Sequence, residues 1–398
     1  MAQDHRIRMS RREALGLFVG TAAGLAGASM ATAPAAGARR RPRDPLTTRL
    51  TRELGISAPI VGAGMGFYSG PALAAAISEA GGLGVLGAAA EPPPRLRSLI
   101  RDTRALTRRP FGVDLVNTTF FGAGVPGVTD LHIEVCAQEG VPLVVFFWDP
   151  PEATWVARLH QVGTKVWMAV ASVEGALAAI DAGVDGLIAT GSQAGGHSRG
   201  AFEGRALPRA DLVPRIVEAA GGRLVLGAGG IATGQGVADT LDEGADGAWI
   251  GTRFAASTES NAHADYKRRV VEASERDVVL TTLFGPEWPD APGWALRNRV
   301  VDQWAGREDE VPVPPPPPAV IGTTSFAGLP YAMPKFSAVL PTVDTQGDFD
   351  EMWFAMGPQS ASLIHDVKPA GQIVTELAAE AAAIRRGAGR PLAAAVRS

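Results

Sequence analysis

The sequence predicts an α/β fold in which a parallel β-sheet closes into a (β/α)8 TIM barrel, with a small, mostly helical subdomain inserted after strand eight. Three observations predict this fold. From residue 47 onward, short apolar runs alternate with amphipathic helical runs, the pattern of βα units. Eight such strands at a spacing of roughly 20–35 residues, seven of them followed by a helical run, fit a closed barrel better than an open sheet. Glycines at the helix ends mark the turns into the next strands.

The expected strands are short and apolar, and turn residues bound them. They cover Ala58–Ala63, Gly84–Leu86, Gly112–Val116, Leu143–Phe147, Lys165–Val170, Gly186–Thr190, Arg223–Ala228 and Ala248–Gly251. The helices expected between them cover Pro71–Ala80, Pro93–Leu106, Thr129–Glu139, Glu152–Val162, Val173–Ala182, Arg209–Ala220 and Gln235–Glu243. A last helix over Pro369–Arg385 is expected to complete the barrel.

The alternation stops between residues 256 and 367, where we expect the inserted subdomain. This segment contains one helical run, Ala262–Glu275, and a stretch rich in tryptophan and proline, Phe284–Trp294. The run Pro314–Pro318 predicts polyproline II structure. We interpret it as a rigid spacer, with a ligand for a partner protein as the alternative. The barrel is then built from residues 46–255 and 368–390.

Residues 1–45 are expected to be a twin-arginine signal peptide and a linker. The pair Arg11-Arg12 precedes a weakly apolar run from Ala14 to about Ala33, with an alanine-rich exit. The run is rich in glycine and too weakly apolar for a typical membrane span, so no stable span is expected after signal removal. The twin-arginine route carries folded proteins, which suits an enzyme that binds its cofactor before export. The alternatives are an uncleaved helical anchor or a basic tail on a cytoplasmic protein.

Composition excludes several classes of protein. The chain has 398 residues, of which 46% are hydrophobic and 20% charged, a normal globular balance. Its 37 basic and 41 acidic residues give a formal net charge of −4, so a nucleic-acid partner has no support. Cys136 is the only cysteine, which excludes an internal disulfide framework, a cysteine zinc site and an iron–sulfur cluster. We expect no metal, and the oligomeric state stays open.

The loops after strands seven and eight indicate a phosphate site. Active sites of such barrels lie at the carboxyl ends of the strands, and phosphate commonly binds after these two. Strand seven ends in a stretch containing Gly229 and Gly230, and strand eight ends at Gly251 and Thr252. Glycines allow backbone N–H groups to approach an anion closely. Two such loops on adjacent strands are better evidence than one, because a single glycine pair also makes ordinary turns.

The candidate catalytic residue is His197. Of the six histidines, it alone lies in a glycine-rich loop at the catalytic end of the barrel, after strand six. A histidine there can exchange a proton near neutral pH, although it could instead be structural and fix the loop by a hydrogen bond. After strand one, Gly64 and Met65 suit a flat aromatic ring lying against the backbone. A nucleophile triad, a zinc-protease motif and a Walker loop are absent from the sequence.

Four segments of the sequence are specific enough to indicate a protein family. They are Ala194-Gly195-Gly196-His197, Ala228-Gly229-Gly230-Ile231-Ala232, residues 244–254 and Thr258-Glu259-Ser260. In this order they resemble the nitronate monooxygenase (2-nitropropane dioxygenase) family of FMN-dependent barrels, which also includes flavin-dependent enoyl-ACP and quinone reductases. The resemblance covers about residues 57–257, 297–308 and 353–377.

The resemblance implies a set of roles for these residues. Gly229, Gly230, Gly251 and Thr252 would hold the FMN phosphate, Gly64 and Met65 would lie near the isoalloxazine, and Gln193, Gly195 and Gly196 would line the cofactor loop. His197 would be the active-site base. In the family a nitronate gives an electron to the flavin, and the reduced flavin activates O2, which releases a carbonyl compound and nitrite. Substrate and O2 are thus the expected partners.

Three positions depart from the family pattern. Asp114, also expected at the cofactor, stands where the family has Asn, and a carboxylate there disfavours an anionic reduced flavin unless it is protonated or paired. The loop after strand four begins with Trp148, which is expected to narrow or reshape the pocket. Gln193 stands where many members have Glu.

Three hypotheses follow for the activity. The first is oxidation of alkyl nitronates or nitroalkanes with FMN and O2. The second is an NAD(P)H-dependent flavin reductase of quinones or enoyl thioesters. The third is a barrel that binds a flavin or another ligand without catalysis, which predicts a yellow protein whose flavin no donor reduces.

Overall fold

The computed structural model describes residues 44–387, except 120, 123–124, 126, 286 and 312–318. The expected signal peptide and the polyproline run therefore lie outside the described residues. Among the helices that the structure describes, none is long and apolar enough to cross a membrane.

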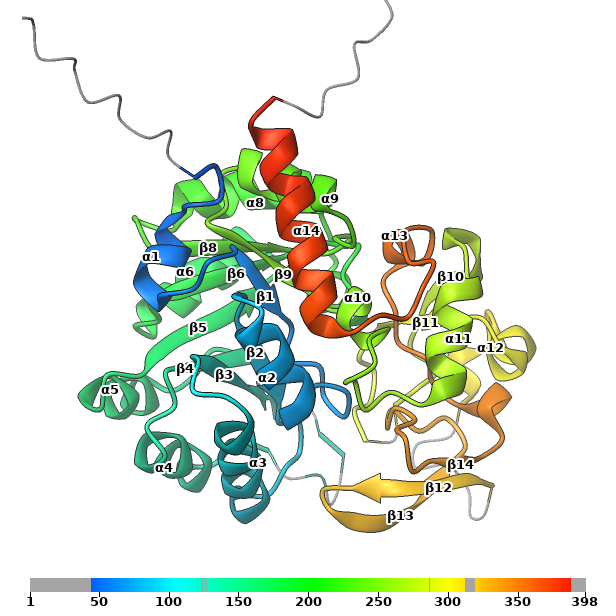
Figure 1. Ribbon diagram of the computed structural model, residues 1–398. Helices are drawn as coiled ribbons and strands as arrows, with labels where there is room; N and C mark the ends of the chain where they lie inside the picture. The colour runs from blue at the N-terminus through cyan, green and yellow to red at the C-terminus, as the bar shows by residue number, and fades with distance from the viewer. Residues whose placement is uncertain are drawn as a thin grey trace, which may run out of the picture. The chain divides into compact units, whose positions relative to one another are not determined.

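Eight parallel strands form the barrel, as the sequence predicts (Figure 1). Their order around the sheet is β1-β9-β8-β6-β5-β4-β3-β2. A parallel bridge between Val61 and Leu83 joins the two ends of this order, so the sheet is nearly closed. The strands are β1 (Ile60–Gly62), β2 (Gly84–Gly87), β3 (Phe111–Asn117), β4 (Leu143–Trp148), β5 (Lys165–Val170), β6 (Gly186–Thr190), β8 (Leu224–Ala228) and β9 (Gly247–Ile250).

Helices alternate with these strands along the chain, and their bounds lie close to those expected. They are α2 (Pro71–Glu79), α3 (Pro93–Leu106), α4 (Asp130–Gln138), α5 (Ala153–Gln161), α6 (Val173–Asp181), α8 (Arg209–Ala219), α9 (Gly234–Asp242) and α14 (Ala370–Arg385). Short helices α1 (Arg49–Leu54), α7 (Arg199–Phe202) and α10 (Thr252–Ala255) were not expected. Leu50 of α1 is fully buried among the residues that fill the barrel.

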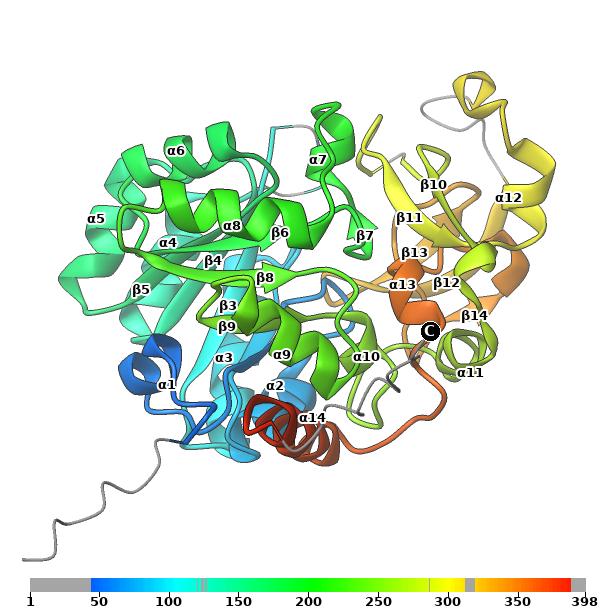
Figure 2. The same cartoon turned by 90° about the horizontal axis from the view of Figure 1, so that it is seen from above.

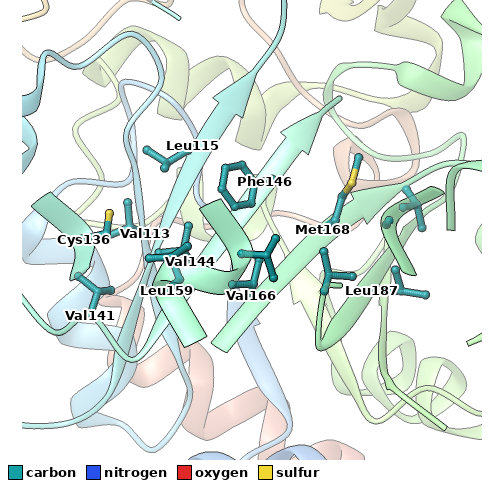
Figure 3. Packing of buried hydrophobic residues seen from close by; sticks show 14 of the residues in the cluster. Val113, Leu115, Cys136, Val141, Val144, Phe146, Leu159, Val166, Met168 and Leu187 are labelled. Atoms are coloured by element: carbon teal, nitrogen blue, oxygen red, sulfur yellow. The ribbon is translucent and has the colours of Figure 1, made fainter. Parts of the chain in front are cut away.

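The strands are apolar on both faces because both faces are covered. One side of the strands packs inside the barrel, where Val145, Trp167 and Ile188 are fully buried. The other side packs on the helices. Figure 3 shows Val144 and Val166 with Cys136 of α4 and Leu159 of α5 in this outer layer. Continuous apolar strands of this kind are typical of parallel sheets enclosed by helices.

The inserted region needs a correction, because it contains more strand than the mostly helical subdomain expected. Besides α11 (Ala264–Glu272), α12 (Arg299–Trp304) and α13 (Pro358–Ala361), it forms β10 (Val278–Thr281), β11 (Gly293–Leu296), β12 (Val320–Phe326), β13 (Leu329–Pro334) and β14 (Gln346–Gly347). It also holds three short 3-10 helices, η1 (Glu275–Asp277), η2 (Glu308–Glu310) and η3 (Phe349–Glu351).

Two physical reasons explain why these strands were missed. Strand β11 pairs on one side with β10 and on the other with β7 (Gly196–His197), a segment far away in the sequence. The β12–β13 hairpin turns at Ala327 and Gly328, both with positive φ. Such a turn favours Asn-Gly or Gly-Gly, so an Ala-Gly pair gives little sequence signal.

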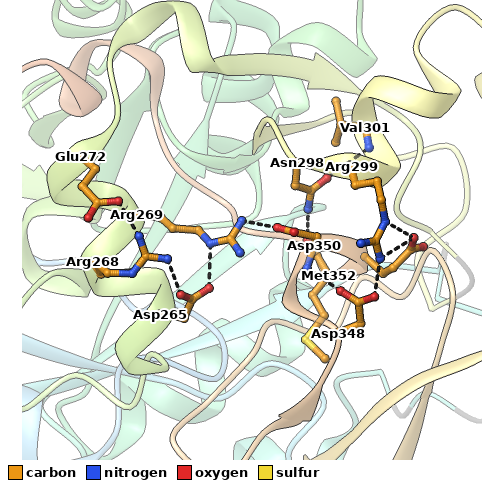
Figure 4. Close-up of polar contacts among 11 residues, drawn as sticks. Asp265, Arg268, Arg269, Glu272, Asn298, Arg299, Val301, Asp348, Asp350 and Met352 are labelled. Carbon is orange, nitrogen blue, oxygen red and sulfur yellow. Dashed lines mark hydrogen bonds and ion pairs between the residues drawn. The ribbon is translucent and has the colours of Figure 1, made fainter.

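Buried aromatic residues and a polar network hold the inserted region together. Figure 4 shows Arg269 of α11 between Asp265 and Asp350, at 2.7 Å from each. The amide of Asn298 donates to the carbonyl of Met352 at 2.7 Å. Figure 2 shows these elements beside the barrel rather than around it.

Candidate active site

Loops at the carboxyl ends of the strands and the inserted region together enclose a cavity of about 250 Å³. Its wall includes all of the residues that the sequence assigned to the site: Gly64, Met65, Asp114, Gln193, Gly195, Gly196, His197, Gly229, Gly230, Gly251 and Thr252. Residues separated by nearly 200 positions thus meet, because parallel strands of a barrel end on the same side.

The turn after β8 lies very close to the backbone of the neighbouring loop after β6. Gly229 and Gly230 have φ of 109° and 70°, values that favour glycine. A Cβ at Gly229 would lie 2.9 Å from the backbone nitrogen of Ala194. Within the described chain, the N–H groups of Gly229 and Gly230 donate to no protein acceptor. These two amides are therefore available for an anion.

Residues 357–360 complete this part of the cavity. The N–H of Gly357 donates to the hydroxyl of Thr252 at 3.3 Å. A Cβ at Gly230 would lie 2.2 Å from the side-chain oxygen of Gln359, and Ser360 also lines the cavity. Sequence reasoning missed Gln359 and Ser360, because no motif marks this short segment more than 100 residues after Thr252.

Gln193 ties the loop after β6 to the start of α8 by a hydrogen bond. Its side-chain oxygen accepts from the N–H of Arg209 at 2.9 Å, so this oxygen faces the start of α8. The guanidinium of Arg209 pairs with Glu243 at 2.9 Å and donates to the carbonyl of Gly229 at 3.1 Å. Gln193 and Arg209 thereby fix the two glycine loops relative to each other. Arg209 was not identified from the sequence, although it is the first residue of a predicted helix.

Asp114 on β3 is a buried acid beside Gly64. A Cβ at Gly64 would lie 2.2 Å from the Cβ of Asp114, so only glycine fits there. The side chain of Asp114 is 7% exposed, and its Oδ1 has no hydrogen-bond partner in the described chain. Burial raises the pKa of Asp114 well above its usual value, because no cation offsets the loss of water. Burial at this position therefore favours the protonated, uncharged form of Asp114 over the carboxylate.

His197 lies on β7, where pairing with Gly293 of β11 fixes its backbone. Its Nδ1 is 3.3 Å from the carbonyl oxygen of Ala291, which can only accept, so Nδ1 carries the proton. In the neutral ring the lone pair is then on Nε2. Burial lowers the pKa of His197 to about 4, and the nearby backbone carbonyls only partly oppose this effect.

Tryptophans surround the imidazole of His197. The ring centroids of Trp288 and Trp353 lie 4.3 Å and 4.6 Å from it, and that of Trp148 lies 6.4 Å away. Trp148 does not line the cavity: it is 1% exposed and packs behind Trp288 at 4.7 Å between ring centroids. Trp148 therefore shapes the pocket indirectly, through Trp288.

The backbone of Trp148 has a φ of 87°, a strained value for a bulky residue.

Most of the remaining wall is apolar or aromatic. Phe67, after β1, stacks on Phe326 of the β12–β13 hairpin with centroids 5.9 Å apart. Tyr68 is 1% exposed, and its hydroxyl has no partner among the described residues. Sequence reasoning missed these residues together with Trp288 and Trp353, since an isolated aromatic residue carries no sign of its tertiary contacts.

Comparisons with known proteins agree with this architecture. The family model "Nitronate monooxygenase" matches residues 47–120 and 116–380. A probable nitronate monooxygenase of Staphylococcus saprophyticus is 32% identical over 301 residues, which are 67% of this chain and 83% of that protein. One from Staphylococcus aureus is 31% identical over 297 residues, 66% of this chain and 82% of its own.

Solved structures give the same result. FabK from Thermotoga maritima is 32% identical with a TM-score of 0.69, covering 86% of this chain and 98% of its own. A nitroalkane oxidase from Streptomyces ansochromogenes is 30% identical with a TM-score of 0.69, covering 85% of this chain and 99% of its own. The chain belongs to the nitronate monooxygenase family and is a flavin-dependent oxidoreductase.

Proposed function

We propose that this enzyme uses FMN and O2 to oxidise alkyl nitronates and nitroalkanes to a carbonyl compound and nitrite. The observation that carries the proposal is a neutral histidine, His197, in a cavity rich in aromatic residues that also contains a glycine turn with two amides that have no acceptor among the described residues. The turn suits the phosphate of a mononucleotide, and the histidine suits removal of a proton from carbon.

The residues present fit FMN. The N–H groups of Gly229 and Gly230 would hold the phosphate, with the hydroxyl of Thr252 beside them. Gly64 lines the cavity and lets Asp114 approach its backbone closely, and Oδ1 of Asp114, which has no partner among the described residues, would supply a polar contact to a bound ring. When bound, the flavin supplies electron transfer and the activation of oxygen.

His197 acts as the base in this proposal. With its proton on Nδ1 held toward the carbonyl of Ala291, its Nε2 is free to accept a proton from the carbon that bears the nitro group. The C–H bond breaks, an N–H bond forms, and the electron pair moves into the nitronate. The low pKa makes His197 by itself a weak base. The adjacent nitronate anion stabilises the imidazolium that forms, which offsets this weakness.

The aromatic wall excludes water from this proton transfer. Trp288 and Trp353 pack on the imidazole. Phe67 and Phe326 form the part of the wall next to the β12–β13 hairpin. Exclusion of water strengthens the electrostatic contact between the anion and the imidazolium.

Steady-state turnover tests the proposal. With ethyl nitronate or nitroethane and no NAD(P)H, the purified enzyme is expected to consume O2 and release nitrite. The apolar wall would also accept a flat quinone, so quinone-dependent oxidation of NAD(P)H is the second candidate. NAD(P)H oxidation without nitrite formation would contradict the first proposal, and a flavin that neither donor reduces would contradict both.

A further inference from the structure

The described part of the cavity wall contains acidic residues but no lysine or arginine. Among the described residues that line it, none is Lys or Arg, and the carboxyl groups are those of Asp114 and Glu287. His197, the remaining ionisable nitrogen, is neutral at pH 7 because burial lowers its pKa. A substrate in this cavity therefore meets no fixed positive charge.

Glu287 is fixed in place by the inserted region. Its Oε1 accepts from the hydroxyls of Tyr331 and, at 2.6 Å, Ser337, and its Oε2 accepts from the N–H of Ala338 at 2.7 Å. Glu287 immediately precedes Trp288, which packs on His197. These three donors are neutral, so they satisfy the carboxylate without cancelling its charge. The cavity wall thus contains a fixed acceptor group, one residue before the tryptophan that packs on the proposed base.

Two cations close to residues of the cavity wall, Arg199 and Lys335, are already paired. Arg199 lies over Trp148 and pairs with Asp149 at 2.7 Å and Glu203 at 2.8 Å. Lys335, which is close in sequence to Ser337, pairs with Glu351 at 2.9 Å. Freeing either would cost an existing ion pair, so neither is an available counterion for a substrate.

We propose that the enzyme selects nitro compounds whose substituent is uncharged and excludes those that carry a second anionic group, with Glu287 as a specificity-determining residue. This inference rests on the proposed function, because it assumes that the nitro compound binds beside His197. A proton on His197 neutralises the single charge of a nitronate. A further carboxylate would be buried without a cationic partner in a cavity whose wall already contains Glu287, and burying an unpaired charge is strongly unfavourable.

Binding of an inert, nearly isosteric pair tests the inference without turnover. The compounds 3-methyl-3-nitrobutanamide and 3-methyl-3-nitrobutanoate differ in one group and have no hydrogen on the nitro-bearing carbon. Titration calorimetry and the visible spectrum of the flavin-loaded enzyme at pH 7.5 would measure both. We expect the carboxylate to bind about 100-fold more weakly than the amide. Equal affinity, or tighter binding of the carboxylate, would overturn the inference.

Variants identify the origin of the selectivity. Glu287→Gln removes the negative charge and keeps one oxygen acceptor, so the preference for the amide should fall by about tenfold. Because this change alters the contact with Ala338, a second variant is needed. Val125→Lys adds a cation to the cavity wall and should also reduce the preference. Val343→Lys makes the same change at a residue that is 67% exposed and outside the wall, and should leave the preference unchanged. If the preference for the amide over the carboxylate is unchanged in both Glu287→Gln and Val125→Lys, charge in the cavity wall is not its cause.

Kinetics separate this inference from the proposed reaction. Oxidation of 3-nitropropanamide but not of 3-nitropropanoate would support both. Equal kcat/KM for the two would contradict the charge selection and leave the proposed reaction intact. If neither is oxidised, the proposed reaction fails, and the binding experiment still decides whether the cavity excludes a carboxylate.

Discussion

The imidazole of His197 has its chemistry set by its surroundings. A backbone carbonyl at 3.3 Å fixes the proton on Nδ1, and three tryptophans remove water from the ring. Removal of water disfavours the charged form, so the ring stays neutral over the physiological pH range. The histidine was identifiable from its glycine-rich loop, whereas its tautomer and its low pKa follow from contacts with residues about 50 to 160 positions away.

Replacing His197 tests its role as a base. His197→Ala should lower kcat/KM for nitroethane by about 10²–10⁴, since that is the usual contribution of a positioned general base. His160→Ala is the matched control, because His160 pairs with Asp185 at 2.9 Å and does not line the cavity. An unimpaired His197→Ala enzyme would exclude the residue from proton transfer.

The pH profile gives a second test of His197. The ring must be neutral to accept a proton, and its pKa is lowered to about 4. Activity is therefore retained as pH falls through 6.5, the usual value, and declines only as the pH approaches 4. Stopped assays of kcat/KM between pH 4 and 8 would check this. A half-loss near pH 6.5 that disappears in His197→Ala would show that the ring is not desolvated as described.

Asp114 should make the stability of the flavin-free protein depend on pH. The folded state keeps the proton on Asp114 at pH values where the unfolded chain has lost it, because burial raises the pKa. The free energy of unfolding then falls as pH rises above the unfolded pKa, by about 1.4 kcal/mol for each pH unit until the folded pKa is reached. Asp114→Asn should remove this part of the slope. Urea unfolding at pH 5 and 7.5 would measure it, and parallel slopes in the two proteins would contradict the protonated state.

At the scale of elements, the loops after β6 and β8 form one unit with the start of α8. Gly229 approaches Ala194 across two loops, and Arg209 links α8 to Gly229 and Glu243. The glycine pairs were visible in the sequence because left-handed backbone needs them. The contacts that join the loops were not, since they depend on the relative positions of separate strands.

Substitution of Gly229 tests this unit. Gly229→Ala introduces a side chain at a φ of 109° and within 2.9 Å of backbone, so we expect flavin affinity to fall at least about tenfold. Gly222→Ala is the control: it has a φ of 82° and nothing within 4 Å of the added Cβ, so it shares the backbone strain without the contact. Fluorescence titration of released and rebound FMN would compare the two. Equal losses would mean that strain alone is responsible.

At the scale of the whole molecule, one barrel and one insertion share the site. The barrel contributes the glycine loops and Asp114, and the insertion contributes Glu287, Trp288 and Trp353. Neither part encloses the cavity alone. Pairing of β7 with β11 joins the parts directly at His197.

Export of the folded protein stays a prediction from the sequence of residues 1–45. Arg11→Lys combined with Arg12→Lys should keep the protein in the cytoplasm, since the twin-arginine pair is the feature that indicates this route. Cell fractionation with measurement of flavin content would follow both forms, and both should contain flavin because it binds before export. An unchanged distribution between fractions would support the cytoplasmic alternative.

The sequence by itself determined the barrel and the barrel loops that carry the glycines and His197. Its continuous apolar runs indicate strands that are buried on both faces, and its glycines mark positions where the backbone needs an unusual conformation. Tertiary structure alone decided the directions in which the pKa values of Asp114 and His197 shift, the strands of the insertion and the placement of Glu287, Trp288 and Trp353. These features depend on which distant residues exclude water or donate hydrogen bonds, and local pattern carries no record of such contacts.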